Sequence, residues 1–225
     1  MKAVILSGVL GLLGSIPGTF GAEAESVGLL NGTDLTGWVQ RGGKAQYRME
    51  NGELVGRAVP GTPNSFLCTE RSYTNFILEL EFKPHPGLNS GVQIRSECFD
   101  RPTRVVTADK TNNIPAGRVH GYQVEIDPSA RAWTGGIYDE SRRGWLADLK
   151  TNAPAREAFR MHEWNRFRIE CRGDEIRTWL NDVPAARLMD SMTPAGFIGL
   201  QVHGIGGNTN LLEIRWRNVR IRELP

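Results

Sequence analysis

The sequence predicts an all-β protein, a sandwich or barrel of many short strands. Three observations predict it: apolar and polar residues alternate in several segments, Gly, Asn and Pro recur between those segments, and helical periodicity is almost absent. The 225 residues are 40% hydrophobic and 23% charged, which is enough to bury a real core. No internal repeat or low-complexity linker marks a boundary, so we expect one domain over residues 25–225.

The first 24 residues differ from the rest of the chain. Lys2 precedes an apolar run from Ala3 to Ile16, and Ala22-Glu23-Ala24 fits a small-x-small cleavage site. The run is too short and too interrupted by glycine for a good membrane span. We therefore expect a cleaved signal peptide over residues 1–24, a periplasmic or secreted protein, and no membrane span.

The elements follow in order along the mature chain. Asn51-Gly52, between Gln46–Met49 and Leu54-Val55, predicts a two-residue hairpin. The further predicted strands are Phe76–Phe82, Ser90–Glu97, His120–Asp127, Asn165–Cys171, Glu175–Leu180, Phe197–His203 and Leu211–Arg222. Two long loops, Phe99–Val119 and Pro128–Met161, interrupt this rhythm, the second with a short helix around Pro154–Arg160. Loops of this length in a compact domain are often functional, so we expect them to form the rim of a site.

Charge and cysteine content narrow the function. The balance of 27 Lys+Arg against 25 Asp+Glu leaves a net charge of +2, which argues against nucleic acid or acidic lipid as a partner. The three cysteines, Cys68, Cys98 and Cys171, lack metal-type spacing, and we interpret them as small buried hydrophobes. Their odd number leaves any disulfide pairing open.

Strand alternation predicts a polar floor. Residues i, i+2 and i+4 of a strand share one face, so the side chains opposite the core residues form sets on four strands. These sets are Gln93 with Arg95 and Glu97; Gln123 with Glu125 and Asp127; Gln201 with His203; and Glu79 with Glu81. Amides and carboxylates for hydroxyl groups, with aromatic rings at the edge, suit a sugar. The alternative, ordinary solvent-facing positions of an antiparallel sheet, holds for any one strand but fits the combined residue choice less well.

Three residues of this floor have chemistry of their own. Glu125 and Asp127 would lie about 6.5–7 Å apart along the strand, a spacing that suits an acid and a base or two ligands of a divalent ion. A plain salt bridge, for instance with Arg95, is the alternative. His203 is the best candidate to titrate near neutral pH, against the alternative of a strand-end histidine bonded to a backbone carbonyl.

Short motifs along the mature chain resemble the 3-keto-disaccharide hydrolase domain family. They are Leu29–Trp38, Asn89–Val92 with Arg95, Gly121–Asp127, Thr134–Tyr138, Trp164-Asn165 with Asn181, Gly199–Gly204 and Arg217–Ile221. The resemblance runs from Val27 to Arg222 and implies a concanavalin A-like jelly-roll β-sandwich of two antiparallel sheets with a concave ligand face. It also implies cleavage of glycosides whose C3 hydroxyl is oxidised to a ketone. Val202 stands where many members carry an acidic residue, which puts a metal-binding role at that position in doubt.

A ketone at C3 acidifies the C2 hydrogen, so the implied chemistry is proton abstraction followed by loss of the glycosidic oxygen from C1. Our hypothesis assigns the base to His203 or Glu125. Arg95, with an optional divalent ion on Glu125 and Asp127 as the only cofactor considered, would stabilise the enolate; Tyr138 or Asp127 would protonate the leaving group. The expected substrate-binding residues are Asn89, Gln93, Gln123 and Gln201 for hydroxyl groups, and Trp133 and Trp145 for stacking.

Several alternatives stay open. The product is either hydrated or released as an unsaturated sugar, and the oligomeric state is undetermined. A non-catalytic carbohydrate-binding module of the same fold is the first rival, and an adhesion role of the long loops is another. A retaining glucanase of this fold would carry a third acid at the position of Ser129, so the sequence argues against it.

Overall fold

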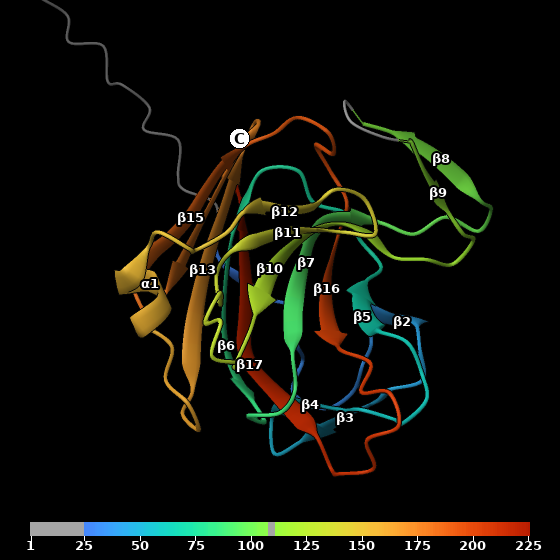
Figure 1. Ribbon diagram of the computed structural model, residues 1–225, viewed down its shortest axis with the longest axis vertical. Coiled ribbons are helices and arrows are strands. Elements are labelled where there is room, and N and C mark those ends of the chain that lie inside the picture. The colour runs from blue at the N-terminus through green and yellow to red at the C-terminus, as the bar shows by residue number, and fades with distance from the viewer. Residues whose placement is uncertain (1–24, 108–110) are drawn as a thin grey trace, which may run out of the picture.

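The computed structural model describes residues 25–107 and 111–225, which form a sandwich of two antiparallel sheets (Figure 1). A separate two-stranded hairpin extends from one side, and one short helix lies at the edge. The predicted jelly-roll β-sandwich is confirmed. The expected signal peptide, residues 1–24, lies outside the described residues.

The first sheet has eight strands, in the order β15-β14-β13-β6-β17-β4-β3, with β1 beside β17. Their bounds are β1 Val27–Gly28, β3 Gln46–Glu50, β4 Glu53–Arg57, β6 Phe76–Pro84, β13 Asn165–Arg172, β14 Glu175–Leu180, β15 Val183–Met189 and β17 Glu213–Glu223. The predicted hairpin joins β3 to β4: Asn51 and Gly52 both have positive φ, 53° and 78°, as a type I′ turn requires.

The second sheet has seven strands, in the order β12-β11-β10-β7-β16-β5-β2. Their bounds are β2 Trp38–Gly42, β5 Ser65–Thr69, β7 Ser90–Glu97, β10 His120–Ile126, β11 Ile137–Glu140, β12 Gly144–Ala147 and β16 Phe197–Val202. The strands β10, β7 and β16 lie side by side at its centre, and they carry the polar residues that the sequence singled out.

The two long loops contain more regular structure than expected. The first holds the hairpin of β8 (Thr103–Val106) and β9 (Thr111–Ile114), and the second holds β11, β12 and the helix α1 (Ala153–Glu157). The α1 helix confirms the short helix expected near Pro154. Strand β15 was not predicted either; it is an edge strand with Pro184 near its start, and an edge is where a sheet tolerates proline.

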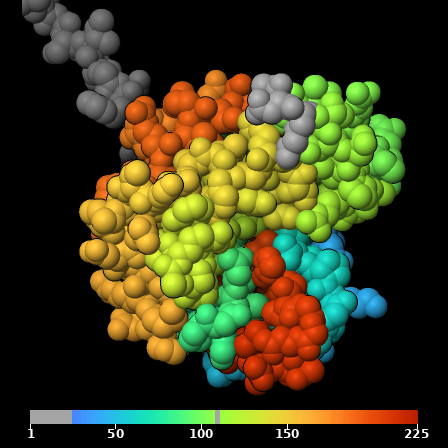
Figure 2. Space-filling model, viewed as in Figure 1, coloured from blue at the N-terminus to red at the C-terminus, as the bar shows by residue number. Residues whose placement is uncertain are grey.

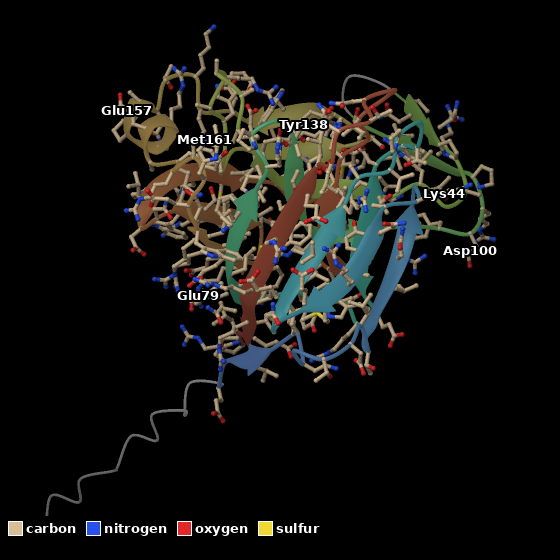
Figure 3. The ribbon with its side chains drawn as sticks, turned by 90° about the horizontal axis from the view of Figure 1, so that it is seen from below. Lys44, Glu79, Asp100, Tyr138, Glu157 and Met161 are labelled. Carbon is tan, nitrogen blue, oxygen red and sulfur yellow. The ribbon has the colours of Figure 1, made fainter. Side chains whose placement is uncertain are left out.

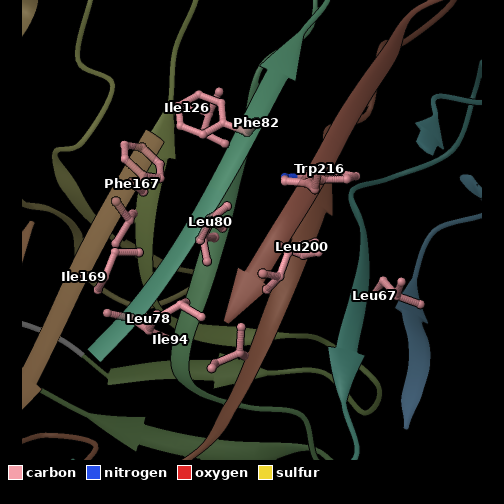
Figure 4. Packing of buried hydrophobic residues seen from close by; sticks show 14 of the residues in the cluster. Leu67, Leu78, Leu80, Phe82, Ile94, Ile126, Phe167, Ile169, Leu200 and Trp216 are labelled. Atoms are coloured by element: carbon pink, nitrogen blue, oxygen red, sulfur yellow. The ribbon is translucent and has the colours of Figure 1, made fainter. Parts of the chain in front are cut away.

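The core lies between the sheets and consists of the apolar side chains that alternate along the central strands (Figure 4). Phe82 of the first sheet meets Phe167 with ring centroids 4.4 Å apart, and Leu200 of the second sheet belongs to the same cluster. Cys68 and Cys171 are fully buried without a disulfide, as small hydrophobes would be, and Cys98 is half-buried and also free. Within the described ranges, no helix is long and apolar enough to span a membrane.

The outer face of the first sheet carries cross-strand ion pairs. Glu79 pairs with Arg166 at 2.6 Å, and Glu81 pairs with Arg217 at 2.5 Å. The expectation that Glu79 and Glu81 share a floor with the other polar strands is therefore wrong, because β6 belongs to the opposite sheet. Strand alternation gives the face of a strand but not the sheet that contains it.

Candidate functional site

The floor of the site comes from a pattern that occurs three times on adjacent strands. Gly-apolar-Gln occurs as Gly91-Val92-Gln93 in β7, Gly121-Tyr122-Gln123 in β10 and Gly199-Leu200-Gln201 in β16. The apolar residue of each triplet belongs to the core, so glycine and glutamine face away from it. The register sets Gln123 and Gly199 beside Gln93, and Glu125 and Gln201 beside Gly91.

The missing side chain at Gly91 makes room for the amide of Gln123. A Cβ atom at position 91 would lie 2.5 Å from the Cδ atom of Gln123, so the glutamine lies flat across the neighbouring strand. From there its Oε1 accepts hydrogen bonds from Nε2 of Gln93 (2.7 Å) and Nε2 of Gln201 (2.9 Å). Its own Nε2 donates to Oε2 of Glu125 at 2.8 Å. The three buried amides form one directed layer that ends at a carboxylate.

Glu125 is buried to 4% exposure at the end of this layer. Its Oε1 accepts from Nδ2 of Asn89 at 2.8 Å and from Nη2 of Arg131 at 3.1 Å. Burial raises the pKa of this carboxyl above its ordinary value, although the hydrogen bonds from Asn89 and Gln123 and the charge of Arg131 oppose the shift. Glu125 therefore holds its proton to higher pH than an exposed glutamate.

Arg131 is the centre of the charged part of the site. Its Nε donates to Oδ2 of Asp127 at 2.7 Å, while its guanidinium carbon lies 5.0 Å from the ring centroids of both Trp133 and Trp145. Two carboxylates and two indole rings thus hold one cation in place. Burial pushes the pKa of Asp127 upward, but hydrogen bonds from Ser129 and Arg131 outweigh it, so the pKa lies below its ordinary value.

The residues considered for a divalent ion do not fit one in this arrangement. Both oxygens of Asp127 and both of Glu125 already accept hydrogen bonds from N–H donors, and Arg131 stands between the two carboxylates where a cation would bind. In the part of the chain that the structure describes, no cluster of three or more His, Cys, Asp or Glu residues could hold a metal. Arg131 provides the positive charge at this point.

Above the floor lies a hollow of about 390 Å³, open to solvent (Figure 2). In Figure 2 it lies where the yellow-green, cyan and red parts of the surface approach one another. Its lining residues come from the second sheet and the loops at its face: Asn64, Asn89, Arg118, Gln123, Glu125, Arg131, Tyr138, Glu140, Trp145, Gln201 and His203. The lining is mainly polar, as a site for sugar hydroxyl groups would be.

His203 stands exposed at the rim, directly after β16. Its Nδ1 lies 2.7 Å from the carbonyl oxygen of Gly204. Because a carbonyl only accepts, this contact favours the neutral tautomer that has its proton on Nδ1 and its lone pair on Nε2. Gly204 is held in turn, since its N–H donates to Oδ1 of Asn64 at 2.9 Å. A Cβ at Gly204 would come 2.7 Å from the carbonyl oxygen of Thr62, so only glycine fits there without a shift.

The β11–β12 hairpin forms the opposite wall. Tyr138 and Trp145 are register partners on it, with ring centroids 5.3 Å apart. Burial, followed by the charges of Glu140 and Glu125, raises the pKa of Tyr138 above its ordinary value, so the phenol keeps its proton. Figure 3 shows Tyr138 well separated from Glu79 on the far sheet.

Arg118 and Glu140 complete the wall. Nη2 of Arg118 lies 2.7 Å from Oε1 of Glu140, and its Nε donates to Oγ of Ser141 at 2.7 Å. The side chain of Glu140 is only 8% exposed, whereas that of Arg118 is 37% exposed. The ion pair thus presents a neutralised guanidinium to the hollow.

The expectation that Arg95 faces the floor is wrong. The register of β7 shifts against both β10 and β16 near this residue, and Arg95 has a φ of 45°, which turns its side chain out of the alternation. Its guanidinium donates to the carbonyl oxygens of Thr74 and Gly173, both at 2.7 Å, and the residue is 1% exposed. Arg95 therefore ties the two sheets together and cannot reach a ligand in the hollow.

The fold places the other predicted site residues in or directly behind the hollow. Those that line the hollow are Asn89, Gln123, Glu125, Tyr138, Trp145, Gln201 and His203. Gln93, Asp127 and Trp133 lie directly behind them and hold them by hydrogen bonds or ring contacts.

Four lining residues were missed by the sequence prediction: Asn64, Arg118, Arg131 and Glu140. Arg118, Arg131 and Glu140 lie in the two loops expected to form the rim, and Arg131 had a further signal because it lies four residues after Asp127 and two before Trp133.

Solved structures with the same fold bind or act on carbohydrates in several cases. A protein of unknown function with a galectin-like fold from Bacillus subtilis superposes with a TM-score of 0.63 at 16% identity, over 90% of this chain and 96% of that one. The carbohydrate-binding module CBM66 from Bacillus subtilis gives 0.57 at 17% identity, over 85% and 98%. A candidate glycosyl hydrolase from Parabacteroides distasonis gives 0.56 at 16% identity, over 89% and 94%.

At these identities the likenesses establish the fold alone. No curated protein matches the chain. A family model does match: the 3-keto-alpha-glucoside-1,2-lyase-like domain covers residues 25–222, nearly the whole described chain. Membership of this family supports a carbohydrate-related function, and the chain belongs to the 3-keto-alpha-glucoside-1,2-lyase-like domain family.

Proposed function

We propose that the hollow binds a 3-keto-glycoside and cleaves its glycosidic bond by elimination across C1 and C2. One observation carries the proposal. A histidine with its lone pair on Nε2, a guanidinium fixed by two carboxylates and a phenol that keeps its proton all line the same hollow. These are a base, an anion-stabilising group and an acid, the three groups that this elimination requires.

The chemistry balances without any further reagent. The C3 ketone acidifies the hydrogen on C2, and the base removes that proton to leave an enolate. The electron pair then forms the C1=C2 double bond as the C1–O bond breaks, and the leaving oxygen takes up a proton from the acid. The products are a free alcohol and an unsaturated keto-sugar, and addition of water to the latter completes a net hydrolysis.

Each step has a residue suited to it. Nε2 of His203 removes the C2 proton, since the Gly204 carbonyl holds the proton of the neutral ring on Nδ1. Arg131 stabilises the enolate oxygen through N–H groups that its contacts with Glu125 and Asp127 leave unused. Tyr138 donates the proton to the leaving oxygen, and Trp145 provides the apolar wall for the sugar ring.

The test is incubation of the protein with a 3-keto-glucoside beside its unoxidised parent, with release of the alcohol followed over time. We expect cleavage of the keto form only, with transient absorbance from the conjugated C1=C2–C3=O group. In heavy water, substrate recovered early is expected to carry deuterium at C2 when His203 is intact and none in His203→Gln. Equal cleavage of both sugars would point instead to an ordinary glycosidase, and cleavage of neither would exclude the enzyme.

A second candidate function is carbohydrate binding without catalysis. It is supported by the fold shared with CBM66 and by the amide layer, which would serve a lectin equally well. Calorimetry with the unoxidised glycoside separates the two functions. A pure binding module would bind that sugar and leave the keto-sugar intact, and His203→Gln would change its affinity without any loss of turnover.

We also propose export to the periplasm or medium, supported by the signal-peptide pattern of residues 1–24. N-terminal sequencing of the protein from its native host tests this. A start near Glu23 or Glu25 is expected, whereas an intact Met1 in the cytoplasmic fraction would refute export.

A further inference from the structure

The charges that line the hollow cancel one another. Arg118 and Arg131 provide two positive charges, and Glu125 and Glu140 provide two negative ones. Each guanidinium pairs with a carboxylate of the lining. Arg118 lies 2.7 Å from Glu140, and Arg131 lies 3.1 Å from Glu125. Arg131 also binds Asp127 behind the lining at 2.7 Å. The side chains around the hollow therefore carry a net charge that is neutral to slightly negative when His203 is uncharged.

A sugar acid would find no uncompensated cation in such a site. Its carboxylate would lose water and face the fixed charges of Glu125 and Glu140, whose side chains are 6% and 8% exposed. Partly buried like charges interact strongly because little solvent screens them. A neutral sugar offers only hydroxyl groups, which the amide layer and the ion pairs can both donate to and accept from.

The two arginines are not equally able to change this selection. Arg131 is fixed by two carboxylates and two indole rings, so loss of one partner leaves it compensated. Within residues 25–107 and 111–225, Arg118 pairs with one carboxylate, that of Glu140, and its other side-chain hydrogen bond goes to the neutral hydroxyl of Ser141. Removal of the Glu140 charge alone would turn Arg118 into a free cation at the wall of the hollow.

We propose that the hollow selects neutral over anionic sugars and that Glu140 sets this selection by neutralising Arg118. The inference rests on the proposed function, in that the hollow is taken to be the sugar site. The substrates it assigns are glycosides of uncharged hexoses; uronides, sulfated sugars and phosphorylated sugars are excluded.

The experiment compares two probes that differ only at C6: a methyl 3-keto-glucoside and the matching methyl 3-keto-glucuronide. The wild-type protein should favour the neutral sugar in kcat/KM by about tenfold or more. The reason is that the carboxylate of the glucuronide is repelled by the like charges of Glu125 and Glu140, whereas the neutral sugar is not. Glu140→Gln keeps the shape and the acceptor oxygen, and it should shift the ratio toward the glucuronide by about tenfold. Calorimetric Kd values for the unoxidised pair should shift in the same direction, and added salt should reduce the shift.

Three variants serve as controls. Glu140→Gln with Arg118→Gln should restore the wild-type ratio, since both charges of the pair are gone. Glu81→Gln removes the partner of Arg217 on the outer face and should leave the ratio unchanged. Should Glu140→Gln fail to fold, Arg118→Gln alone provides the opposite test, because the uncompensated Glu140 should increase the preference for the neutral sugar.

The outcomes separate the inference from the proposed function. If the neutral keto-sugar is cleaved but Glu140→Gln leaves the ratio at its wild-type value, or Glu81→Gln shifts it equally, the role of Glu140 is wrong and the proposed function stands. If the wild-type protein neither binds nor cleaves either probe, both are wrong. Wild-type preference for the glucuronide would overturn the selection itself.

Discussion

The amide of Gln123 occupies the space that a side chain at Gly91 would need: a Cβ there would lie 2.5 Å from Cδ of Gln123. The glutamine can therefore bridge from Gln201 to Glu125 across the strand between them. A glycine on one strand thus determines whether three amides and a carboxylate on neighbouring strands form one layer.

Gly91→Ala should disrupt the layer without unfolding the protein. The added methyl group must displace the Gln123 amide, and overpacking of this kind costs about 1–3 kcal/mol. We expect kcat/KM on the 3-keto-glucoside to fall about tenfold or more. The matched control is Gly28→Ala, where the new Cβ would meet only the Leu30 carbonyl oxygen, at 3.7 Å. If Gly91→Ala is as active as Gly28→Ala, the amide layer does not hold the residues of the site in their active positions.

The tautomer of His203 can be observed directly. Because Nδ1 faces the Gly204 carbonyl, long-range ¹H–¹⁵N NMR spectra near pH 8 should show a protonated Nδ1 and an unprotonated Nε2. Gly204→Ala should disturb this arrangement, since its Cβ would approach the Thr62 carbonyl to 2.7 Å, and should lower kcat more than it changes KM. A ring protonated on Nε2 in the wild-type protein would remove His203 as the base.

Loss of Arg131 should cost the most activity among the charged residues. Arg131→Met removes the enolate-stabilising cation, and loss of one such donor typically costs about 10²–10³ in kcat. It also leaves the carboxylates of Glu125 and Asp127 facing each other without a cation, so the apparent pKa of Glu125 should rise further. Arg131→Lys keeps the charge but loses the planar set of N–H donors of the guanidinium, and it should recover only part of the activity. Full activity in Arg131→Met would refute its role.

The raised pKa of Glu125 makes stability depend on pH in a defined direction. Between the pKa of the unfolded carboxyl and its higher value in the folded protein, the folded state binds more protons than the unfolded state. The free energy of unfolding contributed by this group therefore falls as pH rises through that window. Glu125→Gln should flatten this part of the profile, measured by urea unfolding followed by tryptophan fluorescence, and an unchanged slope would show that another group causes it.

Arg95 should behave as a structural residue. Arg95→Met removes the buried guanidinium from the Thr74 and Gly173 carbonyls, and each buried acceptor left without a donor costs about 1–3 kcal/mol. We expect a lower Tm, with the kcat/KM of the remaining folded protein near the wild-type value at a temperature well below the transition. A large loss of kcat/KM at unchanged Tm would show that Arg95 takes part in the function of the site.

The sequence was informative where the strands are regular. Gln93, Gln123, Glu125 and Gln201 were assigned to one face correctly, because alternation is strict in the regular parts of β7, β10 and β16 that carry them. The same rule failed at Arg95, where a bulge and a positive φ reverse the side chain.

Alternation also cannot report which strands are neighbours, since register and sheet order depend on contacts distant in the sequence. Glu79 was grouped with the floor for this reason, although β6 lies in the other sheet. Arg118 and Glu140 come from segments with no periodic signal, so their ion pair follows only from the folded loops.

The hollow and the charged outer surface belong to different sheets, and this has a practical consequence. Every residue that lines the hollow belongs to the second sheet or its loops, while the first sheet turns a surface of paired charges to the opposite side. That surface is the natural attachment side for a tether, a dye or a solid support. A linker placed at Glu79 or Arg166 would leave the hollow facing the solution, ready for the sugar assays.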